Sequence, residues 1–271
     1  MPSHPHPLAH PHPLAQPRPQ PGATAAGAAA APLRCVPSPL ESARFGRAVE
    51  RLTVTRESAA TLAEVQGAIF ASAAEVVVLR YPAEHVAWFA GLTALGRTAI
   101  FADALVYWRL RAGRGRAPEP PPGLRTGPVT DPSQVEGLIG DIFSAYGNHY
   151  MANPLFDAAE ALAGYQEWAS RSARDGRCLA LRDERGGAVL GLATLEEDGP
   201  VTEILLAGMV PSAQGRGLYA HLLKAVEHRA LARAATGVVI STQGHNVRVQ
   251  RAWARYGFEP ARTVLTVHLL R

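Results

Sequence analysis

A glycine-rich turn between an apolar run and an amphipathic run constrains this chain more than any other segment. The apolar run covers residues 204–210, the turn VPSAQGRGLY covers 210–219, and the amphipathic run begins at Leu218. This order predicts a strand, a tight turn and a helix. Backbone N–H groups at a helix N-terminus carry positive partial charge, and Gly215 and Gly217 let an anion approach them closely. We therefore expect a phosphate-bearing ligand at this turn.

Two well-known phosphate motifs fit the turn poorly. A P-loop needs GxxxxGK followed by Ser or Thr, and the chain has no such segment. A Rossmann fingerprint is matched by Gly215, Gly217 and Ala220, but it also requires an acidic residue after the next strand. That strand, predicted at 237–243, ends in Ser-Thr-Gln, and too little chain follows to complete a doubly wound domain. The Rossmann interpretation is therefore disfavoured.

Composition limits the classes of partner. The chain has 271 residues and a net charge of +4, and its basic residues are almost all arginines scattered along the sequence. The sequence has no basic stripe with interleaved aromatic residues, so nucleic-acid binding is not predicted. Two cysteines, Cys35 and Cys178, are too few for a disulfide framework or a zinc site, so we expect a reduced, cytoplasmic protein without a bound metal. No apolar run is long enough to span a membrane.

The pattern along the chain predicts a tail, two domains and a linker. Residues 1–33 are rich in His, Pro and Ala and are predicted to be disordered, with no fixed geometry for a metal. Residues 34–112 are predicted to form a small α/β domain, and the proline-rich segment 113–123 a linker. The elements predicted in the small domain are strands at 49–54, 75–81 and 98–110 and helices at 58–72 and 84–95.

Residues 124–271 are predicted to form a second α/β domain with a mixed sheet. Its predicted elements are helices at 132–146 and 158–172, a hairpin of 178–183 and 188–196, a strand at 204–210, a helix at 218–232, a strand at 238–243 and a helix at 247–256, before Gly257-Phe258.

The turn resembles motif A of the GNAT acetyltransferases, whose phosphate turn reads Q/R-x-x-G-x-G/A. Residues 214–218 match it, whereas Tyr219 stands where Gly or Ala is usual. Asn246 and Gly257-Phe258 follow at the family's spacing. The resemblance implies a GNAT fold, a mixed central sheet flanked by helices, over 124–271. The smaller α/β domain before it resembles a partial GNAT unit.

The resemblance implies acetyl-CoA as co-substrate. Its pyrophosphate would lie on the backbone N–H groups of the turn, and its pantetheine arm would pair with the strand at 204–210, which carries a bulge in this family. The amide of Met209 or Val210 would polarise the thioester carbonyl. The implied cofactor-binding residues are Met209, Val210, Gln214, Gly215, Arg216, Gly217, Leu218, Tyr219, Asn246 and Trp253.

The catalytic residues follow less directly from the resemblance. Trp253 occupies the position of the family's acidic tyrosine, and indole has no usable acidic proton. Tyr256, about one helical turn further on, is one replacement, and its ring could equally be packed in the core. The thiolate also leaves without strong acid help. Glu203 and His149 are the candidate general bases, and His245 is a weaker third.

A finer resemblance points to the dTDP-fucosamine acetyltransferases, which acetylate the 4-amino group of a nucleotide-activated deoxysugar. The segments that carry it are SARFGRAVERLTV, NHYMANPLF, GYQEWASRS and STQGHN. Arg44 and Trp253 depart from that group's pattern. We therefore expect an N-acetyltransferase acting on a small-molecule amine, with an amino sugar as one acceptor and a homodimer left open. The alternative is a non-catalytic acyl-CoA-binding module with a degenerate active site.

Overall fold

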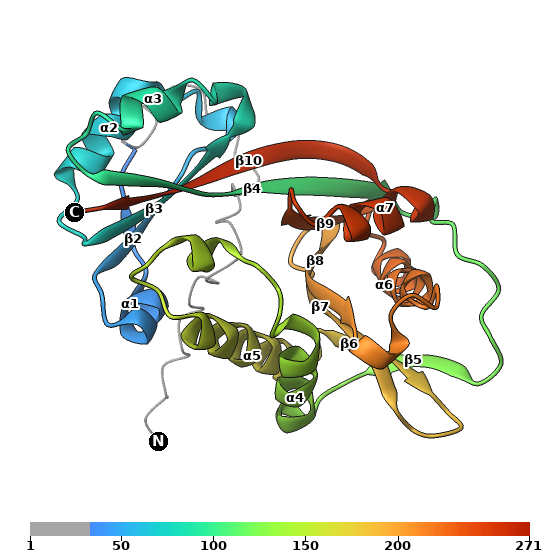
Figure 1. The fold of residues 1–271 in the computed structure, drawn as a ribbon. Helices are drawn as coiled ribbons and strands as arrows, with labels where there is room; N and C mark the ends of the chain where they lie inside the picture. Colours follow the sequence, from blue (N-terminus) through green and yellow to red (C-terminus); the bar gives the residue numbers. More distant parts are fainter. Residues whose placement is uncertain (1–32) are drawn as a thin grey trace, which may run out of the picture.

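The computed structural model describes residues 33–271, so the predicted His/Pro/Ala tail lies almost entirely outside the described residues. Within that range ten strands form one continuous sheet, in the order β1-β2-β3-β10-β4-β9-β8-β7-β6-β5 (Figure 1). The strands are β1 (Val36–Pro37), β2 (Val49–Thr53), β3 (Val76–Pro82), β4 (Thr98–Arg111), β5 (Leu124–Pro128), β6 (Cys178–Asp183), β7 (Val189–Glu196), β8 (Val201–Met209), β9 (Gly237–Gln243) and β10 (Glu259–Leu270).

Helices cover both faces of this sheet. Alternation along the strands sends successive side chains to opposite faces, and the buried clusters show which helices they meet. Helices α2, α3, α6 and α7 pack on one face, and α1, α4 and α5 pack on the other. The helices are α1 (Pro39–Phe45), α2 (Leu62–Ala71), α3 (Trp88–Leu92), α4 (Pro132–Phe143), α5 (Ala158–Arg174), α6 (Tyr219–Ala232) and α7 (Val247–Tyr256), with short 3-10 turns η1 (Arg56–Ser58), η2 (Ala83–His85), η3 (His149–Ala152) and η4 (Pro211–Ala213).

The predicted helix at 84–95 is wrong in extent. Residues 83–85 form a 3-10 turn directly after Pro82, and the helix proper covers only α3. The chain leaves the helix before Gly96, which adopts the left-handed conformation with φ 71°. None of the helices within residues 33–271 combines the length and apolarity that a membrane-spanning helix needs.

The last strand joins the two halves of the chain. Strand β10 lies between β3 and β4 and pairs antiparallel with both, so the C-terminal segment completes the sheet of the N-terminal half. Only β2–β3 and β8–β9 are parallel pairs among the described strands, which confirms the mixed sheet. The division into domains at 34–112 and 124–271 stays a prediction, because one sheet runs through both.

A bulge in β8 opens the sheet beside β9. Thr194 pairs with Leu206, but the next residue of β7 pairs with Ile204, so Leu205 is an extra residue in β8. The parallel pairing of β8 with β9 ends at Ile204 and Ile240. Beyond that point the two strands have no paired residues, although each continues. The bulge and the divergence of these strands confirm the expected geometry of the GNAT sheet.

Candidate active site

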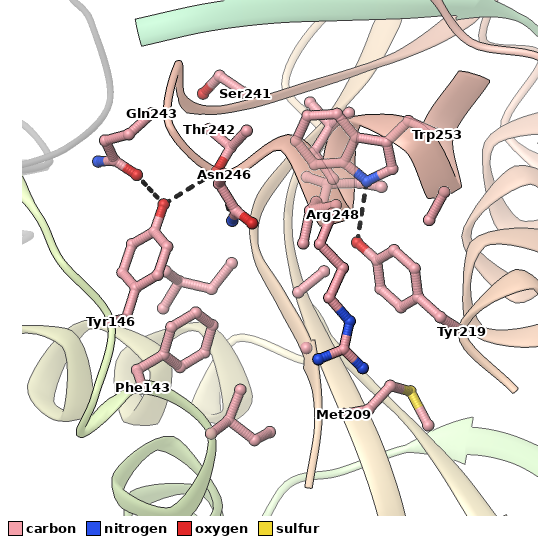
Figure 2. Close-up of a pocket in the computed structure, with 18 of the residues that line it drawn as sticks. Phe143, Tyr146, Met209, Tyr219, Ser241, Thr242, Gln243, Asn246, Arg248 and Trp253 are labelled. Atoms are coloured by element: carbon pink, nitrogen blue, oxygen red, sulfur yellow. Dashed lines mark hydrogen bonds between the residues drawn. The ribbon is translucent and has the colours of Figure 1, made fainter. Parts of the chain in front are cut away.

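A cavity of about 620 Å³ occupies the opening between β8 and β9. The phosphate turn and α7 line one end, and the loop after α4 lines the middle, where Tyr146 faces the end of β9 (Figure 2). The lining also includes Arg80 of β3 and His149 of η3. The cavity therefore connects the predicted anion-binding turn with side chains from the N-terminal half of the chain.

The phosphate turn has the backbone that the sequence predicts. Gly215 and Gly217 adopt φ of 76° and 75°, and a Cβ added at either position would meet nothing within 4 Å. Glycine is needed there for the left-handed backbone, not for space. Gln214 donates from Nε2 to the Met209 carbonyl at 3.1 Å, which ties the turn to the end of β8.

Beside the phosphate turn, the arginine that lines the cavity is Arg248 and not the predicted Arg216. Arg216 is exposed and does not line the cavity. Arg248, in the first turn of α7, extends into the space between Met209 and Tyr219 (Figure 2). Its Nη1 donates to Gln214 Oε1 at 3.4 Å. Sequence reasoning missed Arg248 because no local pattern shows that α7 projects it over the turn.

The ladder of β7 and β8 decides which backbone amides face the opening. The Val210 amide donates to the Leu190 carbonyl at 3.0 Å, so it is not available to a thioester, and that part of the prediction is wrong. In an antiparallel ladder the residues directly before and after a hydrogen-bonded pair point their amides to the other side. The amides of Met209 and Ala207 therefore face β9, where the sheet is open.

Polar side chains close the β9 side of the opening. Asn246 lines the cavity and donates from Nδ2 to Thr242 Oγ1 at 3.0 Å. The Tyr146 hydroxyl donates to Gln243 Oε1 and also lies 3.0 Å from Thr242 Oγ1. Burial raises the pKa of Tyr146, so its hydroxyl keeps its proton at neutral pH.

The two departures from the family motif contact each other. Trp253 Nε1 donates to the Tyr219 hydroxyl at 3.1 Å, and both side chains line the cavity (Figure 2). Burial raises the pKa of Tyr219 to about 12. The oxygen accepts the indole hydrogen bond while the hydroxyl proton remains available for donation. Tyr219 was predicted to bind cofactor, but its pairing with Trp253 could not be read from the sequence.

The structure does not support Tyr256 as the replacement acid. Its hydroxyl donates to Glu227 Oε2 at 2.7 Å, and Glu227 Oε1 accepts the Gly115 amide at 2.9 Å. Tyr256 is buried and does not line the cavity. It holds the predicted linker against α6, and a proton on its hydroxyl cannot reach the opening.

His149 is a hydrogen-bond donor, which replaces its predicted role as a base. The Asn153 Oδ1 accepts the Leu155 amide, so its Nδ2 donates to His268 Nδ1 at 3.1 Å. His268 Nε2–H then donates to His149 Nδ1 at 3.0 Å, which leaves the proton of His149 on Nε2. Burial lowers the pKa of His149 well below its ordinary value, so the ring is neutral.

Glu203 remains the candidate base. It lines the cavity, is half-buried, and directly precedes Ile204, where the pairing of β8 with β9 ends. His245, the third candidate, is exposed and does not line the cavity. The cavity lining also includes most of the predicted cofactor-binding residues, namely Met209, Gln214, Gly215, Gly217, Leu218, Tyr219, Asn246 and Trp253.

Comparison with known proteins shows what this chain is similar to. Residues 142–258 match the sequence model of the acetyltransferase (GNAT) family. No curated protein sequence matches the chain. A GCN5-related N-acetyltransferase from Sphaerobacter thermophilus is similar in structure, with 16% identity, a TM-score of 0.57 and coverage of 83% of this chain and 73% of that chain.

Two further solved structures have the same fold. A GCN5-related N-acetyltransferase from Kribbella flavida has 17% identity, a TM-score of 0.52 and coverage of 81% of both chains. A functionally unknown conserved protein from Staphylococcus epidermidis has 10% identity, a TM-score of 0.59 and coverage of 90% of this chain and 93% of that chain. The protein therefore has the GNAT fold, and its residues 142–258 are similar in sequence to the GNAT acetyltransferases, a family that uses acetyl-CoA as co-substrate.

Proposed function

We propose that this protein is an N-acetyltransferase that moves the acetyl group of acetyl-CoA directly to a primary amine of a small molecule. The observation that carries the proposal is the opening between β8 and β9, which begins at the phosphate turn and continues into a cavity. Backbone amides of Ala207 and Met209 face this opening. A direct transfer needs the donor and the amine in one space, and the cavity provides it.

The residues of the opening fit acetyl-CoA. The amides of residues 214–219 and the guanidinium of Arg248 would hold the phosphates. The open edges of β8 and β9 would pair with the amide groups of the pantetheine arm as with an added strand. When bound, acetyl-CoA supplies an acetyl carbonyl that is activated as a thioester.

Three groups of the chain would act on the reacting atoms. The amide of Ala207 or Met209 donates to the carbonyl oxygen as negative charge develops on it. Glu203 accepts the proton that the amine loses as the new C–N bond forms, directly or through a water molecule. Tyr219 donates a hydrogen bond to the sulfur as the C–S bond breaks.

The pKa of Tyr219 defines what its hydroxyl does. A thiol has an ordinary pKa of about 8.5, whereas burial raises the pKa of Tyr219 to about 12. Complete proton transfer from this tyrosine to the thiolate would be uphill by a factor of about a thousand or more. Tyr219 therefore stabilises the departing thiolate as a donor and keeps its proton, and solvent protonates the sulfur afterwards.

The Trp253 substitution favours one second candidate, a non-catalytic module that binds acyl-CoA. This candidate shares the phosphate turn and the opening but lacks acyl transfer. Purified protein with acetyl-CoA and a panel of primary amines separates the two, with release of free CoA thiol as the readout. The panel includes a nucleotide-linked amino sugar, which is the acceptor implied by the finer resemblance.

We expect thiol release to depend on at least one amine, and Glu203→Gln to lower kcat by about 10²- to 10⁴-fold while acetyl-CoA binding is unchanged. The matched control is Glu259→Gln, at an exposed position outside the cavity lining. Acetyl-CoA binding without acetylation of any amine would support the module instead.

A further inference from the structure

Arg80, which lines the cavity, belongs to a row of polar side chains across three neighbouring strands. Arg80 of β3 lies opposite Thr266 of β10, and Thr266 lies opposite Asp103 of β4. Residues paired across a sheet project to the same face. This is the face that η3 covers, because His149 of η3 contacts His268, two residues after Thr266 on β10.

Arg80 is buried without a counterion. The residue is 4% exposed, and within residues 33–271 it forms no ion pair. Its Nε has no partner, and neither have the Thr266 hydroxyl and the two carboxylate oxygens of Asp103, among the described residues. A buried guanidinium loses its hydration, and the loss is offset only when an anionic partner completes its hydrogen bonds. Arg80 lines the cavity, so a ligand can be that partner.

His149 supplies a second donor beside Arg80. Its Nε2–H is buried and has no partner among the described residues, and its ring lines the cavity. His149 contacts His268 of β10, and Arg80 lies opposite Thr266, two residues before His268, so the two side chains lie on the same face of neighbouring strands. Both groups present only hydrogen-bond donors to the cavity, and a ligand group that satisfies both must be an acceptor.

The charges at the site determine which hydrogen-bond-accepting group of a ligand can bind there. The guanidinium of Arg80 matches a planar carboxylate, which it can bind through two hydrogen bonds. Asp103 lies in the same row and Glu203 lines the same cavity, so the chain already supplies two carboxylates on this face of the sheet. A pyrophosphate would bring two or more negative charges against those groups, whereas a carboxylate brings one.

We propose that the acceptor amine carries a carboxylate, and that this carboxylate binds between the Arg80 guanidinium and the Nε2–H of His149. The acceptor is therefore an amino acid or a similar small amino-carboxylic acid, with its carboxylate at β3 and its amine toward the opening between β8 and β9. This assignment rests on the proposed function, because it names the acceptor of that same site.

Matched ligands test the assignment on the unmodified protein. Each amino acid of a panel is compared with its carboxamide and with the amine that lacks the carboxyl group, in two measurements. The first is kcat/KM by thiol release, and the second is binding to the protein saturated with acetyl-CoA by calorimetry. For at least one amino acid we expect about 10- to 100-fold tighter binding and higher kcat/KM than for its two neutral counterparts.

Arg80→Gln should remove this preference, because it weakens the binding of only the carboxylate-bearing ligand. Arg80→Lys should restore part of the preference, because it keeps the charge but lacks the planar guanidinium. Arg109→Gln, at an exposed position on β4, is the matched control. Acetyl-CoA affinity shows that each variant is folded.

The outcomes separate this inference from the proposed function. Turnover of the neutral amines as fast as the amino acids, or a preference for the nucleotide-linked amino sugar, would overturn the inference and leave the acetyltransferase standing. Carboxylate-dependent binding without any turnover would support the acceptor site and reject the catalytic function. If Arg80→Gln does not bind acetyl-CoA, the comparison of matched ligands on the unmodified protein still tests whether the acceptor carries a carboxylate.

Discussion

Replacing Arg51 with methionine is expected to lower the free energy of unfolding by about 3–5 kcal/mol, because it leaves a buried carboxylate without its counterion. Glu41 is 0% exposed. Arg51 donates to it from Nε at 2.6 Å and from Nη2 at 2.5 Å, and the Tyr150 hydroxyl donates to the same carboxylate at 2.6 Å. Chemical denaturation at neutral pH measures the loss.

Two further variants show whether burial of the charge is the cause. Arg51→Met combined with Glu41→Leu removes both charges, and it should recover most of the lost stability. Arg47→Met breaks an ion pair with Glu75 in which the side chains are 42% and 46% exposed, so we expect a change below about 1 kcal/mol. An Arg51 variant no less stable than the Arg47 variant would contradict this account.

The effect should depend on pH with a defined sign. Burial acts to raise the pKa of Glu41, but the charge of Arg51 and hydrogen bonds from Arg51, Ser38 and Tyr150 outweigh it, and the pKa is lowered. A carboxylate with a lowered pKa in the folded state stabilises the fold above its unfolded pKa of about 4.3. This stability is lost as the pH falls through the folded value. The stability difference between the unmodified protein and Arg51→Met should therefore shrink in acid.

This network also reaches His149, which lines the cavity. Arg51 Nη2 donates to the Tyr150 hydroxyl at 3.2 Å, so β2 is tied to η3. His149, the neighbour of Tyr150, is held in turn by His268 of β10. The position of the His149 Nε2–H at the cavity thus depends on contacts from the N-terminal half of the chain.

Local patterns in the sequence predicted the parts of the site that lie close together in the chain. The turn with Gly215 and Gly217 follows from glycine's access to positive φ and from the apolar and amphipathic runs on either side. Asn246 and Trp253 were found because they follow at fixed distances from the turn, and both line the cavity.

Contacts across the sheet could not be predicted from local sequence patterns. The placement of β10 between β3 and β4 aligns Arg80 with Thr266 and Asp103, which are far apart in the sequence. One signal was present, since Arg80 interrupts the apolar run EVVVLRY and arginine is rarely buried without a partner. Val210 was assigned wrongly because the direction of a backbone amide depends on strand pairing, which a single sequence does not define.

Tyr219→Phe is expected to lower kcat by about 10- to 10³-fold, with little change in the affinity for acetyl-CoA. The substitution removes only the hydroxyl that would donate to the departing sulfur and keeps the ring that lines the cavity. The loss should be smaller than for a true acid catalyst, because a thiolate leaves without a proton. Rates of thiol release and calorimetric titration with acetyl-CoA measure kcat and affinity separately.

Variants of two neighbouring aromatic residues serve as controls for Tyr219→Phe. Trp253→Phe keeps a ring but removes the N–H that positions the Tyr219 hydroxyl, so kcat should fall by less than in Tyr219→Phe. Tyr256→Phe removes a hydroxyl that faces Glu227 and not the cavity, so kcat should be unchanged although the protein is less stable. If Tyr256→Phe reduced kcat more than Tyr219→Phe, the proton donor would have to reach the sulfur from α7. Because the Tyr256 hydroxyl is held beneath α6, that result would require α7 to rotate when acetyl-CoA binds.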